Sequence, residues 1–189
     1  MRIYPFGLRV NSSNYDPAFF WRQGAQIVAL NWQNLDKGMM LNQGMFAGEQ
    51  GWVRKPLGYR GSEDVPVRRN LDLSIEFYAA QGIPLPSGDT NAKGLNPYVI
   101  AHLHVEQPED ESSQNSKEDN NSDAEESSYK RRVQYGSGTN PDFGAQKIVF
   151  PTVSGIVEEL SFVRFVFPVV SLIIPARLFP FPTLCMYRA

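Results

Sequence analysis

The spacing of apolar and polar residues changes near residue 70, and this change divides the chain into two units. Before it, residues 25–32 form a nearly unbroken apolar run of strand length. Such a run predicts a strand buried on both faces of a parallel sheet. After it, the apolar residues of 71–77 occupy every second position and alternate with Asp72, Ser74 and Glu76. That alternation predicts an antiparallel strand with one face in a core and the other in water.

Two short helices are predicted in the first unit, and each begins after an aspartate. Asp16 and Pro17 introduce a helix through residues 18–22, because an aspartate caps free backbone N–H groups and a proline in the first turn loses no hydrogen bond. Asp36 introduces a second helix through residues 37–46. We expect the methionines of this second helix to face a core rather than to bind a cofactor.

Four further strands are predicted in the second unit, which indicates an all-β sandwich. They lie at residues 98–105, 129–135, 147–150 and 158–165, with a turn at 139–144.

Two histidines fall on one face of the predicted strand 98–105. His102 and His104 alternate with Ala101, Leu103 and Val105, so we expect the histidines to be exposed and the apolar residues to be buried. A His-x-His pair on a strand is able to bind a metal ion. Without a third ligand nearby, we interpret this pair as structural and expect no metal.

Three segments do not fit either unit. Residues 106–128 are acidic and rich in Ser, Asn and Gln, so we expect a disordered insertion. Residues 59–70 are polar and contain Gly and Pro, which is typical of a linker. Residues 168–189 are apolar but are interrupted by four prolines and by Arg177. They make a poor membrane span, and we interpret them as an aberrant or unstructured tail.

Charge is distributed unevenly along the chain, although the net charge is only −2. Residues 106–128 hold 9 of the 20 acidic residues and 1 of the 18 basic ones, which leaves 17 basic against 11 acidic residues elsewhere. Mildly basic folded parts suit contact with an anionic membrane surface, and no nucleic-acid motif is present. The single cysteine, Cys185, fits a reducing compartment. Because residues 1–10 lack the apolar core of a signal peptide, we expect a cytoplasmic protein that is peripheral at membranes.

Several motifs of the first unit resemble the end of the Y region of eukaryotic, fungal-like phosphoinositide-specific phospholipase C. In order along the chain they are RIYP, SSNYDP, WRQGAQIVALNWQ and GWVRKP. The resemblance implies that residues 1–58 are the C-terminal part of the Y half of a TIM-type catalytic barrel. A second resemblance, to the C2 domain that follows the barrel in the same family, covers about residues 71–167 and implies a partial C2 sandwich. The implied fold is therefore an α/β fragment of a TIM barrel followed by an incomplete antiparallel sandwich.

The resemblance implies hydrolysis of phosphatidylinositol 4,5-bisphosphate to diacylglycerol and inositol 1,4,5-trisphosphate in signal transduction. In that family two histidines and a calcium ion perform the chemistry, and they belong to the X half of the barrel. The only histidines of this chain, His102 and His104, lie in the predicted sandwich. We therefore assign no catalytic residue and expect this chain alone to be inactive.

The resemblance also implies two substrate-binding residues, Arg2 and Tyr4. In the family the arginine pairs with a ring phosphate of the lipid and the tyrosine packs on the inositol face. Both roles fit the chemistry, since a guanidinium matches a phosphate bidentately and an aromatic ring covers the apolar face of a sugar-like ring.

A calcium site of the C2 type is expected to be weak in this chain. Asn96 and Asn140 stand where the family supplies calcium ligands, and neutral amides make a poor site because affinity follows ligand charge. We expect no tightly bound metal.

Two other functions stay open from the sequence. The chain could be a non-catalytic C2-like module that binds membranes or regulates a partner, or an interaction protein that acts through its acidic insertion. Protein partners cannot be named from these residues.

Overall fold

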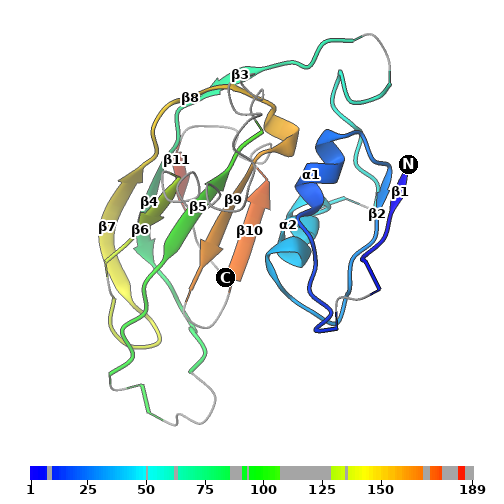
Figure 1. Cartoon of the computed structure of the whole chain (residues 1–189). Coiled ribbons are helices and arrows are strands. Elements are labelled where there is room, and N and C mark those ends of the chain that lie inside the picture. Colours follow the sequence, from blue (N-terminus) through cyan, green and yellow to red (C-terminus); the bar gives the residue numbers. More distant parts are fainter. Residues whose placement is uncertain are drawn as a thin grey trace, which may run out of the picture.

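The computed structural model describes residues 1–7, 10–49, 51–61, 64–85, 91–92, 94–106, 129–134, 136–167, 171–175 and 183–185. Figure 1 shows two units, a small helical one and a larger β-sandwich, joined by a connection that arches over the top of the view. Most of the predicted insertion (residues 107–128) and most of the predicted tail (residues 168–189) lie outside the described residues. Across the described ranges, no helix combines the length and apolar composition needed to cross a bilayer.

The described part of the helical unit, residues 1–58, contains two very short strands and two helices. They are β1 (Arg2–Ile3), α1 (Pro17–Arg22), β2 (Ile27–Val28) and α2 (Lys37–Met45). β1 and β2 pair in parallel, with Arg2 opposite Ile27.

Both helices of this unit begin as the sequence predicts. The Asp16 side chain accepts a hydrogen bond from the backbone N–H of Ala18, and the Asp36 side chain accepts one from Met39. Each aspartate thus satisfies one of the donors that a helix start leaves open. The prediction that the α2 methionines face a core is confirmed, since Met39 is 1% exposed and Met45 is 5% exposed.

The sandwich is built from nine strands and one 3-10 helix among the described residues. They are β3 (Arg69–Leu71), β4 (Ser74–Ala79), β5 (Ile100–His104), β6 (Lys130–Arg132), β7 (Asp142–Val149), β8 (Val153–Ile156), η2 (Glu158–Leu160), β9 (Phe162–Val166), β10 (Ser171–Pro175) and β11 (Thr183–Cys185). One sheet has the order β10-β9-β5-β6, a second has β11-β4-β7, and β3 pairs with β8.

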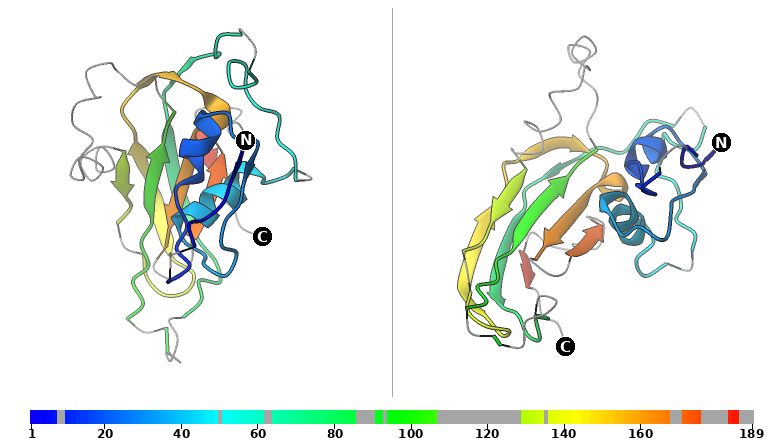
Figure 2. Two further views of the ribbon diagram at one scale, coloured as in Figure 1. Left: turned by 45° about the vertical axis from the view of Figure 1, so that its right-hand side comes forward. Right: turned by 60° about the horizontal axis from the view of Figure 1, so that its bottom comes forward.

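The two main sheets pack face to face, as Figure 2 shows. The alternation predicted at residues 71–77 is confirmed, because Leu73, Ile75 and Phe77 are buried. From the opposite sheet, Phe165 meets Phe77 edge to face, with ring centroids 5.9 Å apart. These alternating apolar positions form one core between the sheets.

A second, smaller core joins the helical unit to the sandwich. We call this interface the seam. Its buried residues are Met40, Leu41 and Met45 of α2, with Val157, Leu160 and Phe162 of the sandwich. In Figure 1 α2 lies beside β10, and the seam runs along that side of the sandwich.

The apolar run at residues 25–32 differs from its prediction. Only two of its residues, Ile27 and Val28, form a strand, β2. Its side chains are not all buried, since Ile27 is 39% exposed and Trp32 is 74% exposed. Burial on both faces needs neighbouring strands and covering helices, whereas among the described residues β2 pairs with β1 alone.

Two predicted boundaries in the sandwich are also corrected. β7 already begins at Asp142, within the predicted turn, and bends at Gly144 and Ala145, which both have positive φ. The predicted strand at 158–165 begins with the turn of η2, and its strand portion starts at Phe162.

The prediction of an unstructured tail is wrong for eight residues. β10 adds to the edge of β9 over five antiparallel residue pairs, and β11 pairs in parallel with β4. The prolines do not prevent this because Pro175 ends β10 and the other three lie outside both strands. An open strand edge offers unpaired backbone groups, and apolar segments of this kind satisfy them.

Candidate functional site

The two residues predicted to contact a lipid headgroup lie together on the edge of the helical unit. Arg2 is in β1 and Tyr4 follows that strand directly, so the two side chains belong to the same face of an extended segment. Both side chains are exposed, and that of Tyr4 is 64% accessible. The ends of parallel strands β1 and β2 meet at this edge, where binding sites of α/β proteins commonly form.

A polar loop is fastened to the same edge by the side chain of Asn14. Its Nδ2 donates to the carbonyl oxygens of Asn31 at 3.2 Å and Asn34 at 3.1 Å, while its Oδ1 accepts from the backbone N–H of Asn31 at 2.6 Å. The Tyr15 hydroxyl donates to the carbonyl of Ala29, just beyond β2. The loop is therefore held over the carboxyl end of β2 by one network.

Asp36 ties this network to the start of α2. Its carboxylate accepts from Asn14 through the backbone N–H at 2.7 Å and through Nδ2 at 3.1 Å. Burial works to raise the pKa of Asp36, but the hydrogen bonds from Asn14, Met39 and Gly38 outweigh it and lower the pKa. The carboxylate is thus held in its charged form.

The two histidines lie on the outer face of β5, as expected, but not in the expected environment. His102 is only 8% exposed, and the ring of His104 stacks near it with centroids 6.3 Å apart. Burial lowers the pKa of His104 to about 3, and Lys37, Arg164, His102 and Arg22 add to this effect. The expectation of exposed histidines is wrong because the helical unit packs over this part of the sheet.

The residues at the expected calcium positions do not fit a calcium ion. Asn140 Oδ1 already accepts from the backbone N–H of Gly82 at 2.8 Å, and Asn96 donates through Nδ2 to the carbonyl of Gly94 at 3.2 Å. Both are neutral, and Ca²⁺ prefers charged oxygen ligands. Within the described ranges, no group of three or more His, Cys, Asp or Glu residues converges in a way that could hold a metal.

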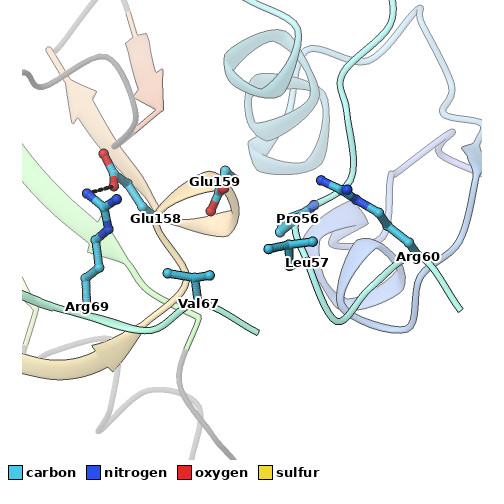
Figure 3. Close-up of a pocket in the computed structure, with 7 residues that line it drawn as sticks. All are labelled: Pro56, Leu57, Arg60, Val67, Arg69, Glu158 and Glu159. Atoms are coloured by element: carbon cyan, nitrogen blue, oxygen red, sulfur yellow. Dashed lines mark ion pairs between the residues drawn. The ribbon is translucent and has the colours of Figure 1, made fainter. Parts of the chain in front are cut away.

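A polar pocket of about 220 Å³ lies where the helical unit meets the sandwich. Figure 3 shows Pro56, Leu57 and Arg60 on one side and Val67, Arg69, Glu158 and Glu159 on the other. Arg69 and Glu158 form an ion pair of 3.3 Å across its sandwich side.

Glu106 is a residue whose environment sequence reasoning missed. The sequence places it in a disordered insertion, but it is 6% exposed and forms an ion pair with Arg22. Its carboxylate also accepts from the Tyr59 hydroxyl at 3.1 Å. Only its position offered a signal, since it continues the even-numbered face of the strand that carries His102 and His104.

The sequence of the helical unit is similar to that of a known protein family. Residues 1–58 match the family described as phosphatidylinositol-specific phospholipase C, Y domain. The chain is 34% identical over 116 residues to 1-phosphatidylinositol 4,5-bisphosphate phosphodiesterase 1 of Candida albicans, which covers 52% of this chain and 11% of that protein. It is 36% identical over 110 residues to the delta-3 phosphodiesterase of the same name from Mus musculus, covering 54% of this chain and 14% of that protein.

A plant relative is more similar over a comparable stretch. The chain is 53% identical over 104 residues to phosphoinositide phospholipase C 3 of Arabidopsis thaliana, covering 51% of this chain and 18% of that protein. The chain therefore spans less than a fifth of the length of these three relatives.

Proposed function

We propose that this chain, whose residues 1–58 match the Y domain of phosphatidylinositol-specific phospholipase C, supplies headgroup contacts and a membrane-facing sandwich to a phosphoinositide phospholipase C. The whole enzyme would hydrolyse phosphatidylinositol 4,5-bisphosphate to diacylglycerol and inositol 1,4,5-trisphosphate. The observation that carries this proposal is the position of Arg2 and Tyr4, exposed side by side at the edge of the β1–β2 pair.

In this function Arg2 binds a phosphate of the headgroup, and Tyr4 orients the inositol ring. The guanidinium of Arg2 donates two parallel hydrogen bonds to a phosphate on the inositol ring, which fixes both distance and angle. The ring of Tyr4 covers the apolar face of the inositol. The Asn14 network supports them indirectly, because it holds the neighbouring loop against the end of β2.

The proposal assigns no bond-breaking step to this chain alone. The two histidines of the sequence lie on β5, where burial holds His104 neutral at physiological pH. Calcium supplies charge stabilisation at the phosphate in such an enzyme, but Asn96 and Asn140 do not suit it. The chain by itself is therefore proposed to be a fragment without hydrolytic activity, cytoplasmic and peripheral at phosphoinositide-containing membranes.

A transplant into an active relative tests the headgroup role. Residues 1–58 replace the matching segment of the Arabidopsis enzyme, and hydrolysis of vesicles that contain phosphatidylinositol 4,5-bisphosphate is measured. We expect the chimera to be active and Arg2→Ala to lower kcat/KM roughly 10- to 100-fold, as loss of a charged hydrogen bond worth about 1.5–3 kcal/mol implies.

Arg54→Ala is the matched control, because Arg54 is an exposed arginine of the same segment that lies outside the β1–β2 edge. An equal loss of activity in the two variants would reject a specific role for Arg2. Turnover by the purified chain alone would reject the proposal that it lacks a catalytic centre.

A further inference from the structure

Basic side chains from both units lie near one point of the seam, around His104. Arg22 and Lys37 of the helical unit and Arg164 of the sheet all act electrostatically on His104. Like charges that come together at an interface oppose its formation. Hydrophobic packing of Phe162 against α2 and Trp21 favours it.

Glu106 is the acidic residue found at this point of the seam. Its side chain contacts two residues from the other side, Arg22 at the end of α1 and Tyr59 just after the helical unit. Arg22 also donates through Nη2 to the carbonyl of Val105 at 3.4 Å. One buried carboxylate therefore contacts both the end of α1 and the chain that follows the helical unit.

The backbone of Glu106 is fixed independently of its side chain. Its N–H donates to Ser161 Oγ at 3.2 Å, and its carbonyl accepts from the N–H of Val157 at 3.1 Å. The Ser161 hydroxyl donates in turn to the carbonyl of Val157 at 2.8 Å, and Ser161 is fully buried. The carboxylate is thus presented to the seam from a rigid part of the sandwich.

Arg22 leads directly to the edge that carries the headgroup residues. The chain turns at Gly24, whose carbonyl accepts from Lys55 Nζ at 2.6 Å. Gln26 then donates its backbone N–H to the carbonyl of Met1 at 3.1 Å, immediately before Arg2. A short stretch of chain and one backbone hydrogen bond therefore connect Arg22 with β1.

We propose that Glu106 is a positioning residue. Its ion pair with Arg22, which we call the clasp, holds the helical unit in one orientation on the sandwich. Removing the charge of Glu106 takes the anionic partner from Arg22, whose side chain is 38% exposed, and leaves the buried side of the ion pair without a charged contact. The helical unit should then detach while the sandwich, which has its own core, stays folded. The consequence for Arg2 and Tyr4 rests on the proposed function above, but the clasp does not.

The full chain carries a natural reporter for the seam. Trp21 lies 6.1 Å from Phe162 and 6.5 Å from Phe46, measured between ring centroids. Trp32 and Trp52 are 74% and 76% exposed, so changing both to Phe leaves Trp21 as the single tryptophan of the chain.

In this background, Glu106→Gln is expected to red-shift the emission of Trp21. Trypsin is expected to cleave residues 59–68 at least about tenfold faster, which corresponds to about 1.4 kcal/mol of lost seam stability. Far-UV circular dichroism of the sandwich should not change. Glu76→Gln is the matched control, because Glu76 forms an ion pair with Lys147 at 3.9 Å on the sandwich surface, and it should change neither readout.

Two results would overturn the clasp: unchanged Trp21 emission in Glu106→Gln, or loss of the sandwich signal together with the seam. The exchanged pair Arg22→Glu/Glu106→Arg tests the charge itself, and it should restore slow cleavage if the ion pair is the cause. Headgroup binding is measured separately by titrating wild type and Arg2→Ala with inositol 1,4,5-trisphosphate. Absence of Arg2-dependent binding, with an intact response to Glu106→Gln, would reject the proposed function and leave the clasp in place.

Discussion

Asn14 and Asp36 are 22 positions apart in the sequence, yet Asp36 receives two hydrogen bonds from Asn14, at 2.7 and 3.1 Å. The same aspartate caps α2 through Met39 at 3.1 Å. One carboxylate therefore fixes the start of a helix and the loop beside the proposed headgroup residues at once. Stability and site geometry are coupled at this point.

Asn14→Ala is expected to lower the free energy of unfolding of the helical unit by about 2–3 kcal/mol. The side chain makes four hydrogen bonds, each with a net contribution of about 1 kcal/mol, and some are replaced by water. Urea unfolding followed by tryptophan fluorescence measures the change. Gln33→Ala serves as control, since Gln33 makes one exposed hydrogen bond to Ser12; a similar loss in both variants would contradict a special role for Asn14.

Acidification is expected to weaken the seam through His104. The folded protein holds the pKa of His104 at about 3, below the ordinary 6.5, so the neutral form is favoured by folding. This contribution to the free energy of unfolding is complete above pH 6.5 and is lost as the pH falls toward 3. The loss approaches about 4 kcal/mol, at 1.36 kcal/mol per pKa unit. His104 Nε2 is buried without a hydrogen-bond partner among the described residues, so a proton there gains no compensation.

His104→Gln should remove most of this pH dependence. The measurement is the urea midpoint of both proteins between pH 7 and pH 4, with Trp21 as the reporter. Parallel curves for the wild type and the variant would show that another group causes the acid sensitivity.

The parts of the fold that the sequence predicted correctly depend on local signals. Asp16 and Asp36 cap helices because a side chain reaches a backbone N–H only two or three residues ahead. The alternation through Leu73, Ile75 and Phe77 reports burial on one side of a strand, whichever sheet that strand joins.

The parts that the sequence did not predict depend on contacts between distant segments. Glu106 stands at the start of an acidic tract, and composition cannot show that Arg22, 84 positions earlier, will meet it. The apolar run that ends at Trp32 reads as buried, but its exposure depends on which elements cover it. The Arg2 and Tyr4 roles came from resemblance and stay predictions.

Alkaline conditions are expected to weaken the seam through Tyr59. Burial, together with the charge and hydrogen bonding of Glu106, raises the pKa of the Tyr59 hydroxyl from 10.0 to about 12. A raised pKa means that its contribution is fully present below pH 10 and is lost as the pH rises through 12. Tyr59→Phe should flatten this loss, as followed by Trp21 emission between pH 9 and pH 12. An unchanged alkaline transition in Tyr59→Phe would assign it to other groups.

Gly58 and Gly61 allow backbone strain to be separated from crowding. Both have positive φ, +84° and +76°, but a Cβ at Gly58 would lie 2.5 Å from Pro66 Cδ while one at Gly61 would meet nothing within 4 Å. Gly61→Ala should therefore cost about 1 kcal/mol of backbone strain. Gly58→Ala should cost about 2–4 kcal/mol, because overpacking adds about 1–3 kcal/mol. Equal thermal shifts in the two variants would show that the Gly58–Pro66 contact is unimportant.

Phe162 and Phe165 are matched residues of β9 that serve the two cores separately. Both are fully buried, but Phe162 belongs to the seam and Phe165 to the core between the sheets. Either change to Ala should cost about 3–5 kcal/mol of local stability. We expect Phe162→Ala to expose Trp21 and speed cleavage of residues 59–68 while the sandwich still melts as a unit. Phe165→Ala should instead lower the melting of the sandwich itself. If both variants lost the two units together, the seam and the sandwich would form one cooperative structure, and the separate detachment expected for Glu106→Gln could not occur.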